Sequence, residues 1–144
     1  MKLFTSGSAI IIIGCGMIGG IIASDAFDRN QQVTVIDKDE ESFRKLRSSY
    51  CGRTLVGDCM LKASLEVAGI KSADIVVVAT NDDNINIMIS QVALSHYKTK
   101  QVLAIVMDLN KKQFCDNLGI QTICPALLSI HKAEEKLFNT EEEV

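Results

Sequence analysis

Short apolar segments alternate along the chain with longer segments in which apolar residues recur at helical spacing. The apolar runs fall at 9–13, 33–36, 54–56, 75–79, 102–106 and 122–124, and most are bounded by Gly, Asp or Asn. Runs of Val and Ile of this length are typical of parallel strands that are buried on both faces. The helical pattern occupies 17–28, 40–49, 61–69, 84–97, 111–118 and 126–138.

This alternation predicts an α/β domain, a three-layer Rossmann-type doubly wound sheet of about six parallel strands. Each crossover returns the chain to the same edge of the sheet in a right-handed sense, which favours the strand order 3-2-1-4-5-6. The length of 144 residues suits one domain, so we expect 1–144 to form a single unit with flexible ends at 1–8 and 140–144. Gly69 and Gly119 stand where helices are expected to end, as C-cap glycines do.

The last helical segment, 126–138, is expected to form a C-terminal helix with an apolar stripe along one side. Pro125 suits its first turn, because the missing N–H of proline costs nothing there. The stripe consists of Leu127, Ile130, Ala133, Leu137 and Phe138. It packs either on the sheet of its own chain or on a second copy of the chain, which would give a dimer or a ring.

Composition and charge exclude several classes of protein. With 47% hydrophobic residues, 23% charged residues and one proline, the chain is expected to be globular. Its net charge of −3 and its scattered basic residues argue against binding to nucleic acid, which needs clustered Lys and Arg. The longest apolar run, 9–23, is too short for a membrane span and contains glycines, so we expect no direct membrane insertion.

The main chemical signal is the turn Gly14-Cys15-Gly16-Met17-Ile18-Gly19, which follows the first strand and opens the first helix. In a dinucleotide-binding turn, the first glycine permits a tight bend and the second lets the backbone approach a phosphate. The third lets the helix press against the strand. The helix N-terminus adds free N–H groups for an anion. The alternative is that these glycines serve packing alone.

Asp37 ends the second strand 18 residues after Gly19, in the position that accepts hydrogen bonds from both ribose hydroxyls. Its charge disfavours a 2′-phosphate, so we expect NAD(H), ATP, ADP or AMP rather than NADP. Two further segments, 57–59 and 80–83, end the third and fourth strands and border the same crevice.

Polar residues in these two segments have two interpretations each. Asp58 either contacts an adenine amino group or caps the helix expected to begin at Met60. Asn81 and Asp82 are good caps for the helical segment 84–97, and they also border the crevice.

Five cysteines, at 15, 51, 59, 115 and 124, form no CxxC pair, and we expect no secretory leader before the first strand. This pattern is typical of reduced thiols in the cytoplasm and indicates no metal site. Small apolar packing is the default role of these side chains. Modification of Cys15 or Cys59, beside the phosphate turn, is a separate hypothesis for blocking nucleotide binding.

Together these motifs resemble the TrkA N-terminal domain, also called the KTN or RCK domain, a cytoplasmic regulator of potassium channels and transporters. The segments that carry the resemblance are 14–19, 35–39, 56–58, 79–83 with Asn86, 118–119 and 123–125. It covers the chain from Ala9 to Leu137. It implies a nucleotide-binding regulatory domain, not an enzyme, that binds NAD(H) or an adenine nucleotide. It further implies assembly as a dimer or ring, and action on a membrane potassium channel or transporter subunit from the cytoplasmic side.

The resemblance also assigns site residues. It gives phosphate contacts to Gly14, Gly16, Met17, Ile18 and Gly19, ribose contacts to Asp37 and Lys38, adenine contacts to Asp58 and Cys59, and the crevice wall to Ala79 and Thr80. No catalytic residue is expected.

The chain departs from the family pattern at two positions. Ile105 stands where the family commonly has an arginine, and Ala126 follows the proline where an acidic residue is common. Many relatives also carry a C-terminal ligand-binding subdomain, so we expect either a piece of a longer protein or a stand-alone subunit.

The main alternative is the nucleotide-binding half of an NAD-dependent oxidoreductase. Hydride transfer needs a substrate pocket and a proton donor or acceptor near the nicotinamide. Neither Tyr50 nor Tyr97 begins a YxxxK pair, and His96 and His131 are expected far from the strand ends. A scaffold without a ligand is a third possibility, against which the complete set of glycines and Asp37 argues.

Overall fold

The computed structural model describes residues 7–138, and its elements follow the expected alternation of strands and helices. The strands are β1 (Ala9–Ile13), β2 (Gln32–Asp37), β3 (Arg53–Val56), β4 (Ile75–Val78), β5 (Gln101–Ile105) and β6 (Gln121–Ile123). The helices are α1 (Met17–Asp28), α2 (Lys62–Val67), α3 (Asp83–Ser95), α4 (Leu109–Asn117) and α5 (Pro125–Phe138), with short 3₁₀ helices η1 (Glu40–Lys45) and η2 (Ile70–Ser72). Of the expected flexible ends, only Gly7 and Ser8 fall within the described residues.

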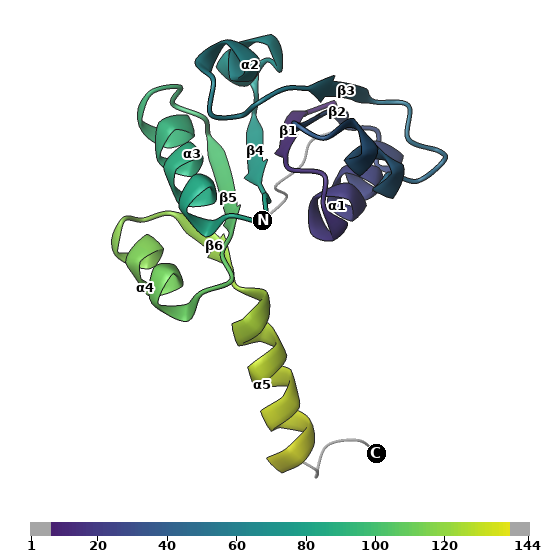
Figure 1. The fold of residues 1–144 in the computed structure, drawn as a ribbon. Coiled ribbons are helices and arrows are strands. Elements are labelled where there is room, and N and C mark those ends of the chain that lie inside the picture. Colours follow the sequence, from purple (N-terminus) through teal and green to yellow (C-terminus); the bar gives the residue numbers. More distant parts are fainter. Residues whose placement is uncertain (1–6, 139–144) are drawn as a thin grey trace.

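All strand pairs are parallel, and the sheet has the order β3-β2-β1-β4-β5-β6 (Figure 1). This confirms the predicted Rossmann-type doubly wound sheet. The order reverses between β1 and β4, because the chain runs outward from β1 to β3 and then returns across the sheet to place β4 on the other side of β1. Ligands of open parallel sheets bind beyond the carboxyl ends of the strands at such a point.

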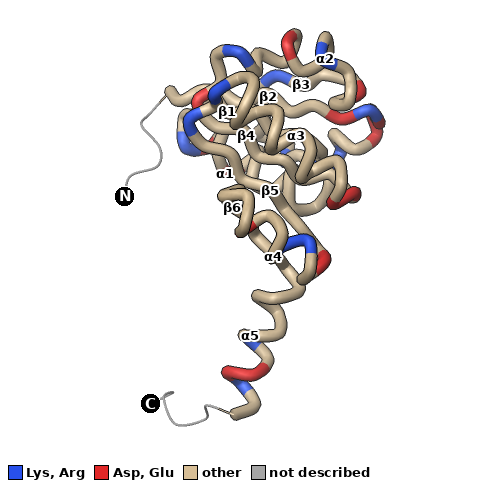
Figure 2. Tube along the Cα trace, turned by 90° about the vertical axis from the view of Figure 1, so that its left-hand side faces the viewer, with Lys and Arg blue, Asp and Glu red and all other residues tan. Residues whose placement is uncertain are grey.

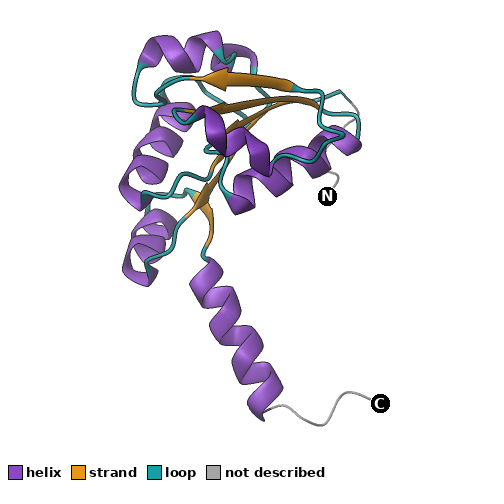
Figure 3. Cartoon of the chain, turned by 45° about the vertical axis from the view of Figure 1, so that its right-hand side comes forward, coloured by secondary structure: helices purple, strands orange, loops and turns teal. Residues whose placement is uncertain are grey.

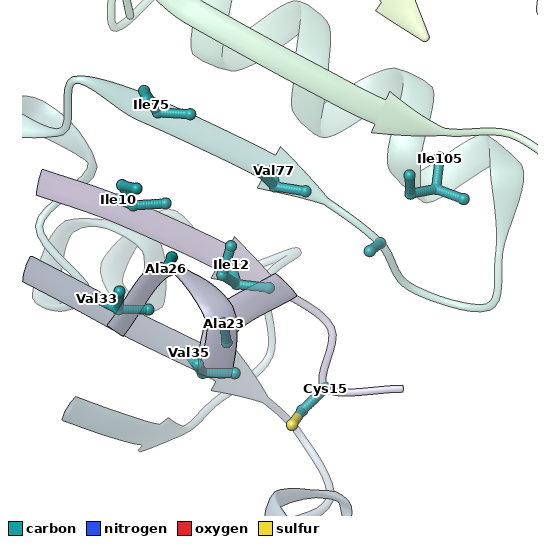
Figure 4. Close-up of a cluster of buried hydrophobic side chains, with 11 residues drawn as sticks. Ile10, Ile12, Cys15, Ala23, Ala26, Val33, Val35, Ile75, Val77 and Ile105 are labelled. Carbon is teal, nitrogen blue, oxygen red and sulfur yellow. The ribbon is translucent and has the colours of Figure 1, made fainter. Parts of the chain in front are cut away.

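Helices cover both faces of the sheet, as Figure 3 shows. Ile10 and Ile12 of β1 point to one face, where they pack with Ala23 of α1 (Figure 4). Ile11 and Ile13 point to the other face and join a cluster with α2 and α3. All four isoleucines are at most 3% exposed, which explains why β1 is an unbroken apolar run.

The segment 40–49, expected to be helical, forms a 3₁₀ helix that ends at Lys45. Phe43 of this helix and its C-cap Leu46 pack against the core three residues apart, which matches the three residues per turn of a 3₁₀ helix. Beyond it, Arg47 holds the chain against α1 through ion pairs with Asp25 and Asp28.

Two glycines end helices as predicted. Gly69 has φ of 95° after the end of α2, and Gly119 has φ of 71° after the end of α4. This left-handed conformation is the one that a C-cap glycine supplies without steric cost.

Helix α5 extends away from the body of the domain (Figures 1 and 3). It begins at Pro125, as predicted, and none of its residues is buried. Leu137 is 68% exposed and Phe138 is 77% exposed. The interpretation that this apolar stripe packs on the sheet of its own chain is therefore wrong.

Charged residues of both signs are interspersed along the chain in the view of Figure 2. Within residues 7–138, none of the helices combines the length and hydropathy that a bilayer crossing requires.

Candidate functional site

A cleft of about 420 Å³ opens at the carboxyl ends of β1, β2, β3 and β4, where the strand order reverses. Its volume falls within the range of small-molecule sites. The residues that line it are Ile13, Gly14, Gly16, Ile36, Asp37, Lys38, Asp39, Ser42, Lys45, Gly57, Asp58, Cys59, Met60, Ala79, Thr80, Asn81 and Ile85. Eight of the eleven residues assigned by sequence line this cleft, while Met17, Ile18 and Gly19 do not.

Two glycines of the turn are required by packing. Gly14 has φ of 96°, and a Cβ there would lie 2.6 Å from the carbonyl oxygen of Ala79. A Cβ on Gly19 would lie 2.0 Å from the carbonyl oxygen of Gly14. Neither residue therefore needs a ligand to explain why it is a glycine.

Gly16 differs, because packing does not explain it. A Cβ built on Gly16 would have no heavy atom within 4 Å, and its φ of −82° suits any residue. The space above Gly16 faces the cleft. A glycine with open space in front of it lets another molecule approach the backbone closely.

The first turn of α1 supplies donors beside that space. Gly16 is the N-cap of α1 and offers no side chain to the first N–H groups, and the first turn contains no acidic residue. The N–H groups of Met17, Ile18 and Gly19 lack acceptors within the helix, because each would need a residue one turn earlier. This arrangement of backbone donors suits an anion, and the side chains of Met17 and Ile18 are exposed.

Asp37 is fixed at the edge of the cleft by two backbone groups. Its Oδ2 accepts a hydrogen bond from the N–H of Cys15 at 2.8 Å, and its Oδ1 accepts one from the N–H of Asp39 at 2.8 Å. A carboxylate has about four lone-pair positions, so acceptor capacity remains for the hydroxyls of a sugar. The contact with Cys15 also ties Asp37 directly to the glycine turn.

The opposite wall is held in place by a buried asparagine. Asn86, only 1% exposed, accepts hydrogen bonds at Oδ1 from the N–H of Thr80 at 3.0 Å and from the Thr80 hydroxyl. Its Nδ2 donates to the carbonyl oxygens of Thr80 at 3.1 Å and of Ile105 at 2.8 Å. Asn86 thus fixes Thr80 in the wall and joins it to the end of β5.

Acidic residues after β4 act as caps and clamps. Asp82 accepts hydrogen bonds from the N–H groups of Asn84 and Ile85, which confirms it as the N-cap of α3. Asp83 accepts from the N–H groups of Met107 and Asp108, each at 2.9 Å, and so connects α3 to the loop after β5.

Asp58 and Cys59 line the cleft near the end of β3. Oδ1 of Asp58 accepts a hydrogen bond from the N–H of Met60 at 2.9 Å, which closes the turn before α2. The N-cap of α2 is Leu61, so the expectation that Asp58 caps a helix from Met60 is wrong. Burial, followed by the charge of Asp58, raises the pKa of the Cys59 thiol.

Cys15 is buried within the turn, and burial followed by the charge of Asp37 raises the pKa of its thiol. All five cysteines are free thiols. Raised pKa values favour the neutral thiol, which is a poor nucleophile.

Ser42 and Lys45, which line the cleft from η1, are not predicted by the sequence motifs. Their spacing of three was the available signal, but it has meaning only once the segment is known to be a 3₁₀ helix. Ile105, which stands where the family commonly has an arginine, is only 5% exposed and belongs to the buried cluster of Figure 4.

Comparison with known proteins gives a family match over most of the chain. A family model described as the TrkA-N domain matches residues 10–125. The Trk system potassium uptake protein TrkA of Streptomyces coelicolor is 34% identical over 114 residues, which cover 79% of this chain and 51% of that protein. The protein of the same name from Vibrio alginolyticus is 33% identical over 95 residues, covering 66% of this chain and 21% of that protein. The chain thus spans at most about half the length of these relatives.

Solved structures share the fold. GsuK bound to ADP superposes with a TM-score of 0.79 at 22% identity, covering 97% of this chain and 36% of that chain. The AMP-bound C-terminal domain of Kef from Shewanella denitrificans superposes with a TM-score of 0.78 at 19% identity, covering 94% of this chain and 83% of that chain.

Proposed function

Because the chain belongs to the TrkA-N domain family, we propose that it binds an adenine nucleotide and thereby regulates potassium movement through a membrane transport protein. The observation that carries the nucleotide proposal is Gly16, whose open space lies at the uncapped start of α1. The names of the relatives carry the potassium proposal, since they describe potassium uptake proteins.

The proposed ligand is NAD(H), ATP, ADP or AMP. Its phosphates are placed at the N–H groups of the first turn of α1, over Gly16. Asp37 accepts from the ribose hydroxyls with Lys38 beside it, and Asp58 and Cys59 lie at the adenine end, opposite the wall formed by Ala79 and Thr80. Structures of similar fold contain ADP, AMP and NAD, which supports this ligand class.

We place the domain on the cytoplasmic side of the membrane, in contact with a potassium channel or transporter subunit. There a nucleotide regulates transport only if it binds one arrangement of the assembly more tightly than another. A shift from 1:99 to 99:1 needs about 5.5 kcal/mol of differential affinity.

The exposed helix α5 supports assembly of several copies. Ile130 is 42% exposed and Leu137 is 68% exposed, on a helix with no buried residue. A second copy of the chain would cover this stripe. We expect the double variant Ile130→Glu and Leu137→Glu to reduce the mass measured by light scattering to that of a monomer, while Ser129→Glu leaves it unchanged. A wild-type monomer would contradict the proposal.

An oxidoreductase has less support. His131 lies in α5 and His96 is the C-cap of α3, and neither lines the cleft. The relatives that match over most of the chain are described as potassium uptake proteins.

The nucleotide proposal is tested by Gly16→Asp. Aspartate is a preferred N-cap, so the variant should fold with a free energy of unfolding within a few tenths of a kcal/mol of wild type. Its carboxylate would occupy the open space and repel phosphate. We expect isothermal titration with AMP, ADP, ATP, NAD and NADH to detect binding to wild type and at least a tenfold loss in the variant.

The matched control is Asn110→Asp, which adds the same charge in the first turn of α4, outside the cleft. It should bind as wild type does. Undiminished binding by Gly16→Asp, or no binding of any of these nucleotides to wild type, would refute the proposal.

A further inference from the structure

We infer that Lys45 supplies the side-chain cation for the nucleotide phosphates and sets the preference of the cleft for phosphorylated ligands. This inference rests on the proposed nucleotide site and names a residue of that site outside the glycine turn.

The 3₁₀ geometry of η1 directs Lys45 to the cleft. With three residues per turn, side chains at positions i and i+3 lie one above the other. Asp39, Ser42 and Lys45 are spaced in this way, and all three line the cleft. In an α-helix, the same residues would drift around the axis by about 60° per step.

The backbone of Lys45 is fixed beside the start of α1. A Cβ on Gly20 would lie 3.3 Å from the Cβ of Lys45 and 3.4 Å from its carbonyl oxygen, so η1 packs closely against α1 at this point. Two residues later, the N–H of Arg47 donates to the hydroxyl of Ser24 at 3.1 Å, and its guanidinium pairs with two aspartates of α1. The end of the Lys45 side chain is therefore the part that remains free to meet a ligand.

Lys45 lies close enough to act electrostatically on the turn. Its charge lowers the pKa of the Cys15 thiol, against the larger raising effects of burial and of Asp37. Cys15 lies between the two glycines that shape the phosphate turn. A cation that acts on Cys15 also acts on an anion bound over Gly16.

The ammonium group of Lys45 has no competing ion pair within residues 7–138. The ion pairs there involve Arg44, Arg47, Lys62, Lys71, Lys112 and Lys132. The cleft carboxylates of Asp37, Asp39 and Asp58 each accept from backbone N–H groups instead. Ile105, on the other side of β1, contributes no charge.

The ligand chemistry follows from this placement. Backbone N–H groups at the start of α1 provide directed donors, and a lysine adds a mobile point charge, a combination suited to phosphate. Adenosine, which lacks phosphate, gains nothing from Lys45. The contribution of Lys45 should therefore appear with AMP and ADP and be absent with adenosine.

The test is titration of adenosine, AMP and ADP into wild type, Lys45→Ala, Lys45→Arg and the neighbouring control Arg44→Ala. We expect Lys45→Ala to weaken ADP binding about tenfold, the lower end of the effect of a hydrogen bond to a charged group. The affinity for adenosine should change less than about twofold, because adenosine has no phosphate for Lys45 to contact. Lys45→Arg should restore most of the ADP affinity, and Arg44→Ala should behave as wild type, because Arg44 pairs with Glu41.

If Lys45→Ala lost equal affinity for adenosine and for ADP, the inference would be overturned, and unchanged ADP affinity in this variant would overturn it as well. It would also be overturned if Lys38→Ala, rather than Lys45→Ala, showed the phosphate-dependent loss. Failure of wild type to bind any of the three ligands would instead refute the proposed function itself, so the two failures are distinguishable.

Discussion

Replacing Gly14 by alanine should destabilise the domain strongly, whereas the same change at Gly16 should not. The left-handed φ of 96° at Gly14 costs a residue with a side chain about 1–2 kcal/mol. The added Cβ would also lie 2.6 Å from the carbonyl oxygen of Ala79 and 2.7 Å from the N of Thr80. Overlap of this kind costs about 1–3 kcal/mol, so the central expectation is a loss of about 3 kcal/mol.

The neighbouring backbone cannot move aside easily to relieve this overlap. The N–H of Ala79 donates to the carbonyl oxygen of Ile13 at 2.7 Å, and the N–H of Thr80 donates to Asn86 at 3.0 Å. Gly16→Ala changes an N-cap from glycine to a poorer residue, which costs at most about 1 kcal/mol.

Urea denaturation followed by circular dichroism measures both variants. A loss of 3 kcal/mol corresponds to a fall in Tm of about 10 °C for a domain of this size. If Gly14→Ala and Gly16→Ala differ by less than about 1 kcal/mol, the turn is not packed against the backbone as described.

Three further outcomes are expected. Asn86→Ala leaves the N–H and carbonyl groups of Thr80 and the carbonyl group of Ile105 without their side-chain partner. The free energy of unfolding measured by urea denaturation should therefore fall by about 3 kcal/mol. A fall of less than about 1 kcal/mol would contradict the role of Asn86 in the cleft wall. Burial raises the pKa of Tyr50 from 10.0 to about 12. Because the folded-state pKa is the higher one, the stability contribution of Tyr50 is complete below pH 10 and is lost as the pH rises from 10 to 12. The difference in stability between wild type and Tyr50→Phe should fall over that interval, and a constant difference would refute the assignment. Bound ADP should slow alkylation of Cys59, which lines the cleft, but not of the exposed Cys51, as followed by mass spectrometry. Equal rates at Cys59 with and without ADP would place the ligand elsewhere.

Much of the fold could be predicted because the relevant signals are local. The unbroken Ile run of β1 indicates burial on both faces, and alternation with helices leaves few possible topologies. The glycine turn and Asp37 were found for the same reason, since their spacing follows directly from a strand, a turn and a helix.

Other features depend on contacts between distant segments. The helical spacing of 40–49 does not distinguish an α-helix from the 3₁₀ helix that forms, and Arg47 beyond it pairs with residues of α1 about twenty residues earlier in the chain. Without that geometry, Lys45 cannot be assigned to the cleft. The capping pattern identified Asp82, but the links from Asn86 to β5 and from Asp83 to the following loop join segments that only the fold brings together.

The hydrogen bonds that hold the cleft wall also connect it to the strand that precedes α5. Thr80 is joined through Asn86 to the end of β5, and the N–H of Val106 donates to the carbonyl oxygen of Ile123, two residues before α5 begins. At 1.5 Å per residue, the 14 residues of α5 form a rigid arm of about 21 Å. A tilt of about 5° at its base would move the far end by about 2 Å, so a small displacement at the edge of the sheet would be enlarged at the far end of the helix.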